Sequence, residues 1–363
     1  MSGASIEETL ELWAASLREV KARVRPLFTQ ERVAASAGLF VDGLLGEERR
    51  KTGWMRAEAA GDPGPWRQQA ILGRGRWDAD ALRDIVRDYA LEHLAEDDAV
   101  LVVDETGFLK QGKASCGVAW QYTGSAGKIT NCQIGVFAAY VSGKGHALID
   151  RALYLPKAWA ADPARRAAAH VPQQIAFATK PHLARAMVER AIAAGVPFAW
   201  VVGDSIYGVS EGEMALRRAG KGYVLGVNSN SQFNSWGAKP AVAGTAAAIA
   251  SALDPAAWRR LSAGAGAKGE RLFDWAYLEL ADLEAGLDGP APALDRHQGF
   301  HCGSGRAPSG EKGQLAISDI AADQKTPGPQ AGQALVVFGG VKIGQFQVGP
   351  VEQPLALGSG TGR

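Results

Sequence analysis

Two stretches decide the fold of this chain, and they are Ala99-Val-Leu-Val-Val-Asp104 and Phe198-Ala-Trp-Val-Val-Gly-Asp204. In each of them a short, continuously apolar run leads into an aspartate. A strand that is buried on both faces shows this pattern, and such strands belong to parallel or mixed sheets that helices cover. We therefore predict two buried strands, Ala99–Val103 and Phe198–Val202, each of which runs out just before its aspartate.

The residues around these stretches alternate between strand and helix patterns. The expected order from residue 99 to residue 227 is strand, strand, strand, helix, strand, helix, strand. Three antiparallel strands followed by alternating strands and helices predict an α/β fold, a mixed sheet with helices on its faces. The further strands expected are Gly117–Tyr122, Ile129–Val141, Gly222–Val227 and, later, Trp275–Leu280, and the helices are Lys180–Ala194 and Glu211–Ala219.

The first hundred residues read as helical. Leu10 and Trp13 recur at helical spacing in one segment, and a second amphipathic segment covers Arg32–Leu45. Asp78 precedes a third segment, which extends to Leu94, in the position of an N-terminal cap. We predict a helical region ahead of the sheet, with these apolar faces turned toward its core.

The composition changes sharply near the C-terminus. All ten Trp lie at or before Trp275, and residues 286–363 contain 16 Gly and 7 Pro. Sequence of this kind has little to bury, so packing does not repay the entropy lost on ordering it. We expect a low-complexity, disordered tail, in which the apolar run Ala334–Phe338 is able to form one strand.

Global composition excludes several classes of protein. The chain has 363 residues, 47% of them hydrophobic, and a formal net charge of +1, so it can fill a core and does not have the overall charge of a nucleic-acid binder. Its three cysteines, Cys116, Cys132 and Cys302, cannot build a disulfide framework or a four-cysteine zinc module. The N-terminus lacks a signal-peptide pattern, and no apolar run reaches the ~18 residues of a membrane span. We expect a soluble, cytoplasmic protein with no membrane association.

Asp104 and Asp204 are the strongest candidates for chemistry. Ligands of open α/β sheets collect at the carboxyl ends of the strands, so neighbouring strands would bring both carboxylates to one crevice. Mg²⁺ prefers oxygen ligands and takes one or two protein carboxylates together with substrate phosphates. The alternative is that each aspartate only forms a turn or caps a helix, which is the commoner use of an aspartate after a strand.

The residues that flank the two aspartates carry a resemblance. Asp104-Glu-Thr-Gly-Phe-Leu-Lys110 and Gly203-Asp-Ser-Ile-Tyr-Gly208 resemble blocks of the DDE-superfamily insertion-sequence transposases, in particular a group related to the IS-four-like enzymes. The resemblance covers roughly Phe28 to Leu283. It implies that Asp104 and Asp204 are the first two acidic ligands of Mg²⁺ or Mn²⁺, and that Glu105 and Lys110 are not ligands.

The resemblance also implies an organisation and a function. It implies a helical DNA-binding region at residues 1–97, an RNase H-like catalytic core at 98–230, a partial β-rich insertion at 231–285 and the tail at 286–363. The function implied is that of a DNA transposase, which cuts and joins DNA at the ends of an insertion sequence. The partners implied are double-stranded DNA and a second copy of the chain on that DNA.

A local excess of positive charge supports a phosphate partner. Residues 49–76 carry seven Lys or Arg against two acidic residues, and Trp54, Trp66 and, directly after the stretch, Trp77 are interleaved with them. Basic side chains neutralise backbone phosphates and give affinity without reading the sequence. We expect Arg49, Arg50, Lys51 and Arg56 to contact DNA phosphates, and the alternative is an ordinary solvated face.

Other readings of the chain stay open. One is a non-catalytic DNA binder, a transposase remnant that occupies element ends. Another is a serine hydrolase, because Gly203-Asp-Ser205 resembles the nucleophile block of GDS-type esterases. Ser205 also fits the role of a turn or helix cap. His297, His301 and Cys302 have metal-like spacing, but three ligands in a Gly-rich tail make no closed site.

The third acid of the implied DDE set is not found. The family places it as a Glu on a helix after the β insertion, and a helix fixes a carboxylate where a flexible loop cannot. The acids available are Glu270 and Glu279 in the presumed insertion, and Glu284, Glu311 and Glu352 among Gly and Pro. We expect a core with two of three ligands, and a reading-frame change near Leu287 to Leu294 would explain the altered tail.

Overall fold

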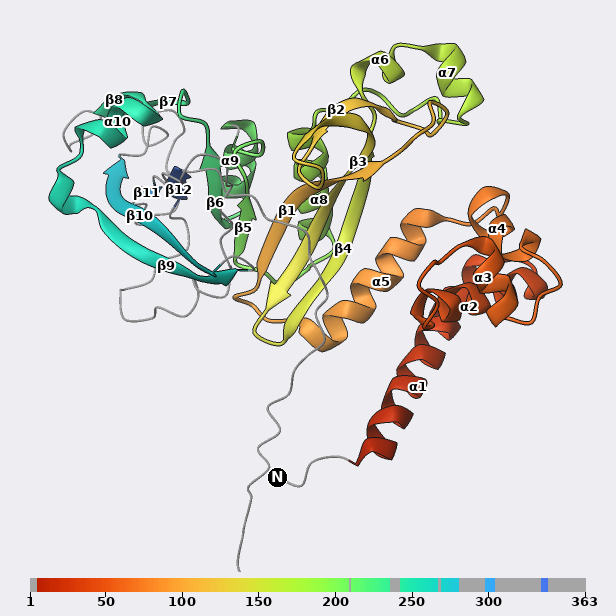
Figure 1. Ribbon diagram of the computed structural model, residues 1–363. Helices are drawn as coiled ribbons and strands as arrows, with labels where there is room; N and C mark the ends of the chain where they lie inside the picture. Colours follow the sequence, from red (N-terminus) through yellow and green to blue (C-terminus); the bar gives the residue numbers. More distant parts are fainter. Residues whose placement is uncertain are drawn as a thin grey trace, which may run out of the picture. The chain divides into compact units, whose positions relative to one another are not determined.

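A computed structural model describes residues 5–208, 210–235, 242–266, 269–280, 298–303 and 334–338 of the chain. It divides into two compact units. The first contains residues 1–102, 137–151 and 186–200, and the second contains residues 103–136, 152–185 and 201–363. Figure 1 shows the elements along the chain. The predicted boundaries at residues 97, 230 and 285 remain predictions.

The first unit begins with the helical region that the sequence predicts. Its helices are α1 (Ile6–Val24), a 3₁₀ turn at Arg25–Leu27, α2 (Glu31–Leu45), α3 (Gly53–Ala59), α4 (Trp66–Gly73) and α5 (Ala79–Leu94). Asp78 caps α5, as predicted, by accepting hydrogen bonds from the backbone N–H groups of Asp80 and Ala81. None of the described helices is both long enough and apolar enough to cross a membrane.

The core of this helical region differs from the predicted one. α1 forms, but Leu10 and Trp13 on its expected inner face are exposed. The buried cluster instead lies between the segment after α1, helix α2 and helix α4. Phe28 fills it, and the small alanines of α2 leave room for this ring. Its buried members are Phe28, Ala34, Ala37, Phe40 and Ile71.

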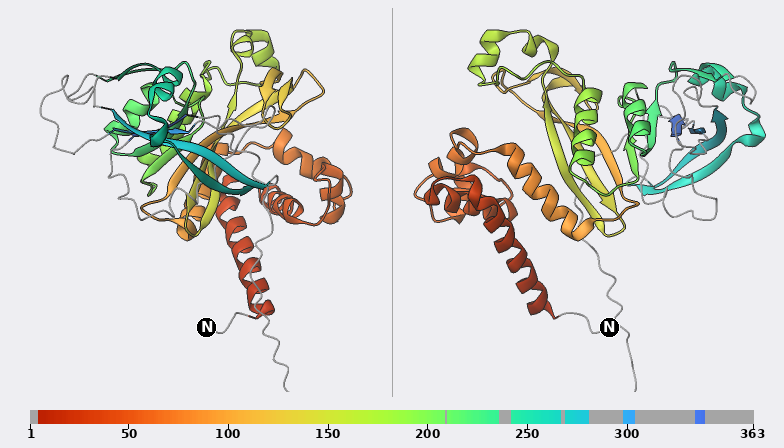
Figure 2. Two further views of the ribbon diagram at one scale, coloured as in Figure 1. Left: turned by 60° about the vertical axis from the view of Figure 1, so that its left-hand side comes forward. Right: turned by 180° about the vertical axis from the view of Figure 1, so that it is seen from behind.

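The central sheet follows the predicted α/β pattern. Its strands are β1 (Val100–Leu109), β2 (Ala119–Thr123), β3 (Lys128–Ser142), β4 (Gly145–Tyr154), β5 (Trp200–Gly203) and β6 (Gly222–Val227), in the order β2-β3-β1-β5-β6 with β4 beside β3. The associated helices are α6 (Lys157–Ala160), α7 (Pro163–Ala168), α8 (Lys180–Ala193) and α9 (Ser210–Arg218). This mixed sheet with flanking helices is consistent with an RNase H-like core (Figure 2).

Two features of this sheet correct the sequence prediction. β4 was not expected, because charged Asp150 interrupts its apolar pattern; in the structure Asp150 is buried and paired with Arg190 of α8 at 2.9 Å. β1 does not end before Asp104 but continues to Leu109. The apolar run marks where β1 is buried, and the strand goes on where its burial ends.

The segments after β6 are rich in β structure. They are β7 (Gln232–Ser235), β8 (Val242–Thr245), α10 (Ala246–Ala252), a 3₁₀ turn at Pro255–Ala257, β9 (Arg259–Gly266) and β10 (Gly269–Leu280). Val227, Ala246 and Ala276 form their buried cluster. β10 contains the strand predicted at Trp275–Leu280.

Two strands come from the Gly/Pro-rich tail. β12 (Ala334–Phe338) is the strand predicted there, and it pairs in parallel with β6. β11 (Gln298–Gly303) pairs with β10 and was not predicted. The strand at Ala334–Phe338 is thus confirmed, and most of the tail lies outside the described residues. Glu284, Glu311, Glu352, His297 and the proposed frame-change region lie outside the described residues.

Candidate active site

Pairing of β1 with β5 brings Asp104 and Asp204 together. The two strands are neighbours, and the backbone N–H of Ala199 donates to the carbonyl of Ala99 at 2.9 Å, which places the starts of the strands side by side. Asp104 and Asp204 follow these alanines at the same spacing. Because neighbouring strands lie about 4.8 Å apart, both carboxylates reach the same part of the sheet.

The carboxyl group of Asp104 holds its proton unusually well. Burial is the main cause that raises its pKa, to about 7, and the negative charges of Glu105 and Asp204 raise it further. The backbone N–H of Glu105, which donates to Asp104 Oδ1 at 2.8 Å, and the ammonium of Lys180 act in the opposite direction. A nearby cation would favour the ionised form, so this carboxyl group is suited to a positively charged ligand.

A tight turn fixes Asp204 directly after β5. Its Oδ1 accepts a hydrogen bond from the backbone N–H of Ile206 at 2.9 Å, and its carbonyl accepts one from Tyr207 at 3.0 Å. A Cβ at Gly208 would lie 2.1 Å from the carbonyl oxygen of Gly226 on β6. Glycine at position 208 therefore lets the turn rest against the neighbouring strand.

Glu105 ties three elements together behind the aspartate pair. Its Oε1 accepts a hydrogen bond from Lys180 Nζ of α8 at 2.8 Å, and its Oε2 accepts one from the Tyr207 hydroxyl at 2.5 Å. Tyr207 is buried, and burial together with the Glu105 charge raises the pKa of its hydroxyl far above the usual range. Both oxygens of Glu105 are thus engaged, and its bond to Tyr207 links the segment that carries Asp104 to the turn that carries Asp204.

A third acid does not join this pair within the described part of the chain. There, no group of three or more His, Cys, Asp or Glu side chains is placed to hold a metal ion. Glu270 is exposed on β10. Sequence reasoning did not single out Glu213 of α9, a half-buried acid whose pKa is raised by burial while Arg217 favours its charged form. Only its burial distinguishes it, and the sequence does not reveal that.

The donor set fits a divalent cation in part. Two carboxylates supply hard oxygen ligands, and Mg²⁺ is commonly held by one or two carboxylates, with waters and substrate phosphates completing its shell. Asp104 and Asp204 are the residues that would hold such an ion. Ser205 lies in the same turn, and within the described part of the chain no histidine hydrogen-bonds to it.

The structure separates the four basic residues expected to contact DNA. Arg49 and Arg50 are exposed, and neither pairs with another described side chain. Lys51 donates to the carbonyl of Gly46. Arg56 does not fit the expectation, because it is only 8% exposed and its guanidinium lies 4.0 Å from the ring centre of Phe40.

Close packing explains the burial of Arg56. A Cβ at Gly43 would lie 2.7 Å from Cγ of Arg56, so the absence of a side chain there makes room for the arginine between α2 and α3.

Two nearby tryptophans, Trp54 and Trp66, are exposed, whereas Trp77 donates its indole N–H to the carbonyl of Ile71. Arg49, Arg50, Arg74 and Arg76 are the exposed arginines of residues 49–76 that have no ion pair among the described residues, whereas exposed Arg67 pairs with Asp62.

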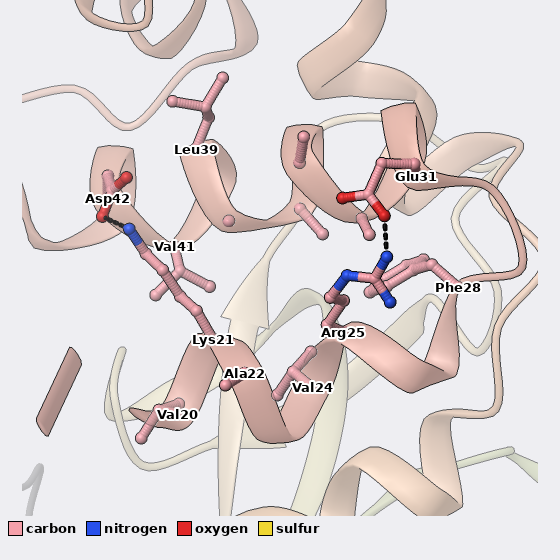
Figure 3. Close-up of a pocket in the computed structure, with 14 residues that line it drawn as sticks. Val20, Lys21, Ala22, Val24, Arg25, Phe28, Glu31, Leu39, Val41 and Asp42 are labelled. Carbon is pink, nitrogen blue, oxygen red and sulfur yellow. Dashed lines mark hydrogen bonds and ion pairs between the residues drawn. The ribbon is translucent and has the colours of Figure 1, made fainter. Parts of the chain in front are cut away.

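The helical region also contains a cavity of about 470 Å³ between α1 and α2. Its lining is largely apolar, and Figure 3 shows Lys21 paired with Asp42 and Arg25 paired with Glu31 beside it. The acids and bases in its wall thus neutralise one another. This cavity contains none of the residues of the aspartate pair, and we do not assign it to the candidate active site.

The raised pKa of Asp104 makes stability depend on pH. The folded chain binds this proton more tightly than the unfolded chain, so the stabilisation is complete below the ordinary pKa near 3.8 and is lost as pH rises through about 7. Asp104→Asn mimics the protonated form at every pH. In urea unfolding with EDTA, we expect the stability of the variant relative to wild type to grow by about 3 kcal/mol between pH 5 and pH 8. A difference that does not change with pH would contradict this.

The bond between Glu105 and Tyr207 makes a second prediction. Tyr207→Phe removes one hydroxyl and keeps the buried ring, so it should lower the free energy of unfolding by about 1–3 kcal/mol, as for other hydrogen bonds to charged groups. Glu105→Gln tests the other partner. In a double-mutant cycle measured by urea unfolding, the two effects should fall short of additivity by at least about 0.5 kcal/mol. Strict additivity would mean that the bond does not form.

Comparison with known proteins shows the family of the chain. A family described as DDE superfamily endonuclease matches residues 23–269 of the chain. A curated relative from Microchaete diplosiphon, "Probable transposase for insertion sequence element IS701", is 27% identical over 190 residues. That match covers 52% of this chain and 47% of the relative, so the chain spans about half the length of the curated protein it matches. The family match covers most of the chain, including both aspartates, and the chain belongs to the DDE superfamily of endonucleases.

Proposed function

We propose that this chain is a transposase-type endonuclease that acts on the DNA ends of an insertion sequence. The observation that carries the proposal is the aspartate pair on neighbouring strands, in which Asp104 is half-buried and has its pKa raised to about 7, mainly by burial. Asp104 and Asp204 are its catalytic residues and hold Mg²⁺ or Mn²⁺. The family match and the name of the curated relative support this assignment.

The residues of the chain have separate tasks in the proposed reaction. Asp104 gives up its proton, and Asp104 and Asp204 present oxygen ligands on one part of the sheet. The hydrogen bonds of Glu105 to Lys180 and Tyr207 hold β1, which contains Asp104, and the turn after β5, which contains Asp204, in place. Divalent cations, when bound, activate water and stabilise the leaving oxygen of the cut strand. The freed 3′-hydroxyl then attacks a phosphodiester of the target DNA in line: its oxygen bonds to the phosphorus, the target strand's 3′-oxygen leaves, and no covalent bond to the enzyme forms.

Double-stranded DNA is the proposed partner, and Arg49 and Arg50 are the proposed phosphate contacts. Both side chains are exposed, and neither forms an ion pair with another described residue. Their charges are therefore available to phosphates. Lys51 lies beside them and is partly engaged by Gly46. Transposition brings two element ends together, so we propose that two copies of the chain act on the DNA.

A non-catalytic DNA binder is the second candidate. It is favoured by one observation, the missing third acid among the described residues. A two-carboxylate site would bind cations weakly and support little strand transfer. DNA binding that falls with salt, without cleavage at any Mg²⁺ or Mn²⁺ concentration, would identify this second function.

Metal-dependent nicking tests the first candidate. The purified chain is mixed with supercoiled plasmid that carries the element ends, in Mg²⁺ or Mn²⁺, and nicked circles are quantified on a gel. Asp104→Asn and Asp204→Asn should each abolish nicking, because each removes a ligand charge and keeps the side-chain shape. Asp98→Asn, at an exposed position before β1, is the matched control and should nick like wild type. Nicking that survives in either of the first two variants would refute the assignment.

The exposed arginines make a prediction about salt. Arg49→Ala with Arg50→Ala should weaken duplex binding across sequences and flatten the plot of log affinity against log salt by about 1.8, or about 0.9 for each lost contact. Fluorescence anisotropy with a labelled duplex measures this. Arg18→Ala, which removes an exposed arginine paired with Glu11, is the control and should leave the slope unchanged. An unchanged slope in the double variant would assign Arg49 and Arg50 to the solvated face.

A further inference from the structure

The β2–β3 hairpin has one buried face and one exposed aromatic face. Thr123 and Cys132 are fully buried on the first. On the second, Trp120 is 76% exposed, Tyr122 is 41% exposed, and Ile129, the cross-strand partner of Tyr122, is 64% exposed. We call Trp120, Tyr122 and Ile129 the hairpin face.

The position of the hairpin makes this face accessible. β2 is the last strand of the sheet, as Figure 1 shows, and it pairs only with β3 in the described sheet order. Trp120 and Tyr122 are two residues apart on this strand, so they project from the same side. Two neighbouring aromatic side chains at an open sheet edge are a surface that a binding partner can cover.

The chain segment that contains the hairpin face carries positive charge and no acidic residue. From Thr106 to Ile149 the sequence contains no Asp or Glu, whereas Lys110, Lys113 and Lys128 lie in this stretch. Lys128 is exposed at the turn of the hairpin, where it is the cross-strand partner of Thr123 and so leaves the strand on the side opposite the hairpin face. Lys110 is anchored to the hairpin, because its backbone N–H donates to the carbonyl of Asn131, the cross-strand partner of Trp120, at 2.9 Å. The surroundings of the face therefore complement a polyanion.

Aromatic rings flanked by lysines select for nucleic acid over protein. The centres of protein–protein interfaces are depleted in lysine, so the charges argue against a protein partner. Proteins that bind single strands combine a positive track for the backbone with aromatic side chains on which bases stack. In a duplex the base faces already stack on one another, so only unpaired bases expose a face to Trp120 and Tyr122.

We propose that the hairpin face binds an unpaired segment of DNA, with bases stacked on Trp120 and Tyr122 and phosphates near Lys110 and Lys128. The inference deepens the proposed function, on which it rests, by naming single-stranded DNA as a ligand beside the catalytic sheet. β1 carries Asp104 and leads directly into Lys110, so the site and the hairpin face are connected through one strand.

Oligonucleotide binding tests this inference. Fluorescence anisotropy of a labelled oligo-dT and of a labelled duplex of the same length is measured in EDTA, in the Asp104→Asn background, so that cleavage plays no part. Trp120→Ala with Tyr122→Ala should weaken oligo-dT binding at least about tenfold, since loss of one stacked base typically costs about five- to a hundredfold in affinity. Duplex binding should change less than about twofold. Trp13→Ala, at an exposed position of α1, is the matched control.

Each further outcome supports or overturns the inference. Trp120→Phe keeps a stacking ring and should retain most of the oligo-dT affinity, and circular dichroism reports whether each variant folds. Unchanged oligo-dT binding in the double variant, or an equal loss for oligo-dT and duplex, overturns the proposal. A double variant that becomes monomeric while wild type sediments as a dimer identifies the face as a contact between copies and also overturns it. If the chain without hairpin substitutions binds duplex but not oligo-dT, this inference alone is refuted. If it binds neither, the proposed function is refuted as well.

Discussion

The parallel pairing of β1 with β5 is the constraint on which the rest of this site depends. It aligns two strands whose starts are joined through Ala99 and Ala199, and it thereby carries Asp104 and Asp204 to the same part of the sheet. Two carboxylates so close repel each other, which contributes to the raised pKa of Asp104. The bond between Glu105 and Tyr207 opposes that repulsion by tying the two segments together.

The sequence was sufficient to predict the buried parts of the sheet. Continuous apolar runs identified β1, β5 and β6, because burial on both faces leaves a pattern that needs no knowledge of partners. The same reasoning failed where a partner decides the outcome. β4 contains Asp150, a charge that is stable in the core only because Arg190 pairs with it. The sequence suggests that Arg56 is a surface charge, but in the structure it packs against Gly43 and Phe40 of α2.

The candidate site was predictable for a similar reason. Asp104 and Asp204 directly follow apolar runs, so the edge of burial revealed them. The network behind them was not predictable, because Glu105, Lys180 and Tyr207 are far apart in the sequence and meet only in the fold. The hairpin face was also not predicted. The alternating pattern of side chains along β2 is the same whether another element covers that face or leaves it exposed.

If Asp104 and Asp204 together form a divalent-cation site, Mn²⁺ should bind to the chain without DNA. Electron paramagnetic resonance of free Mn²⁺, titrated with the chain, measures this binding. We expect weak binding by wild type and by Asp98→Asn. Asp104→Asn and Asp204→Asn should each weaken binding at least about tenfold, since each removes one of the two anionic ligands. The same Mn²⁺ affinity in all four proteins would show that the aspartate pair does not hold the cation.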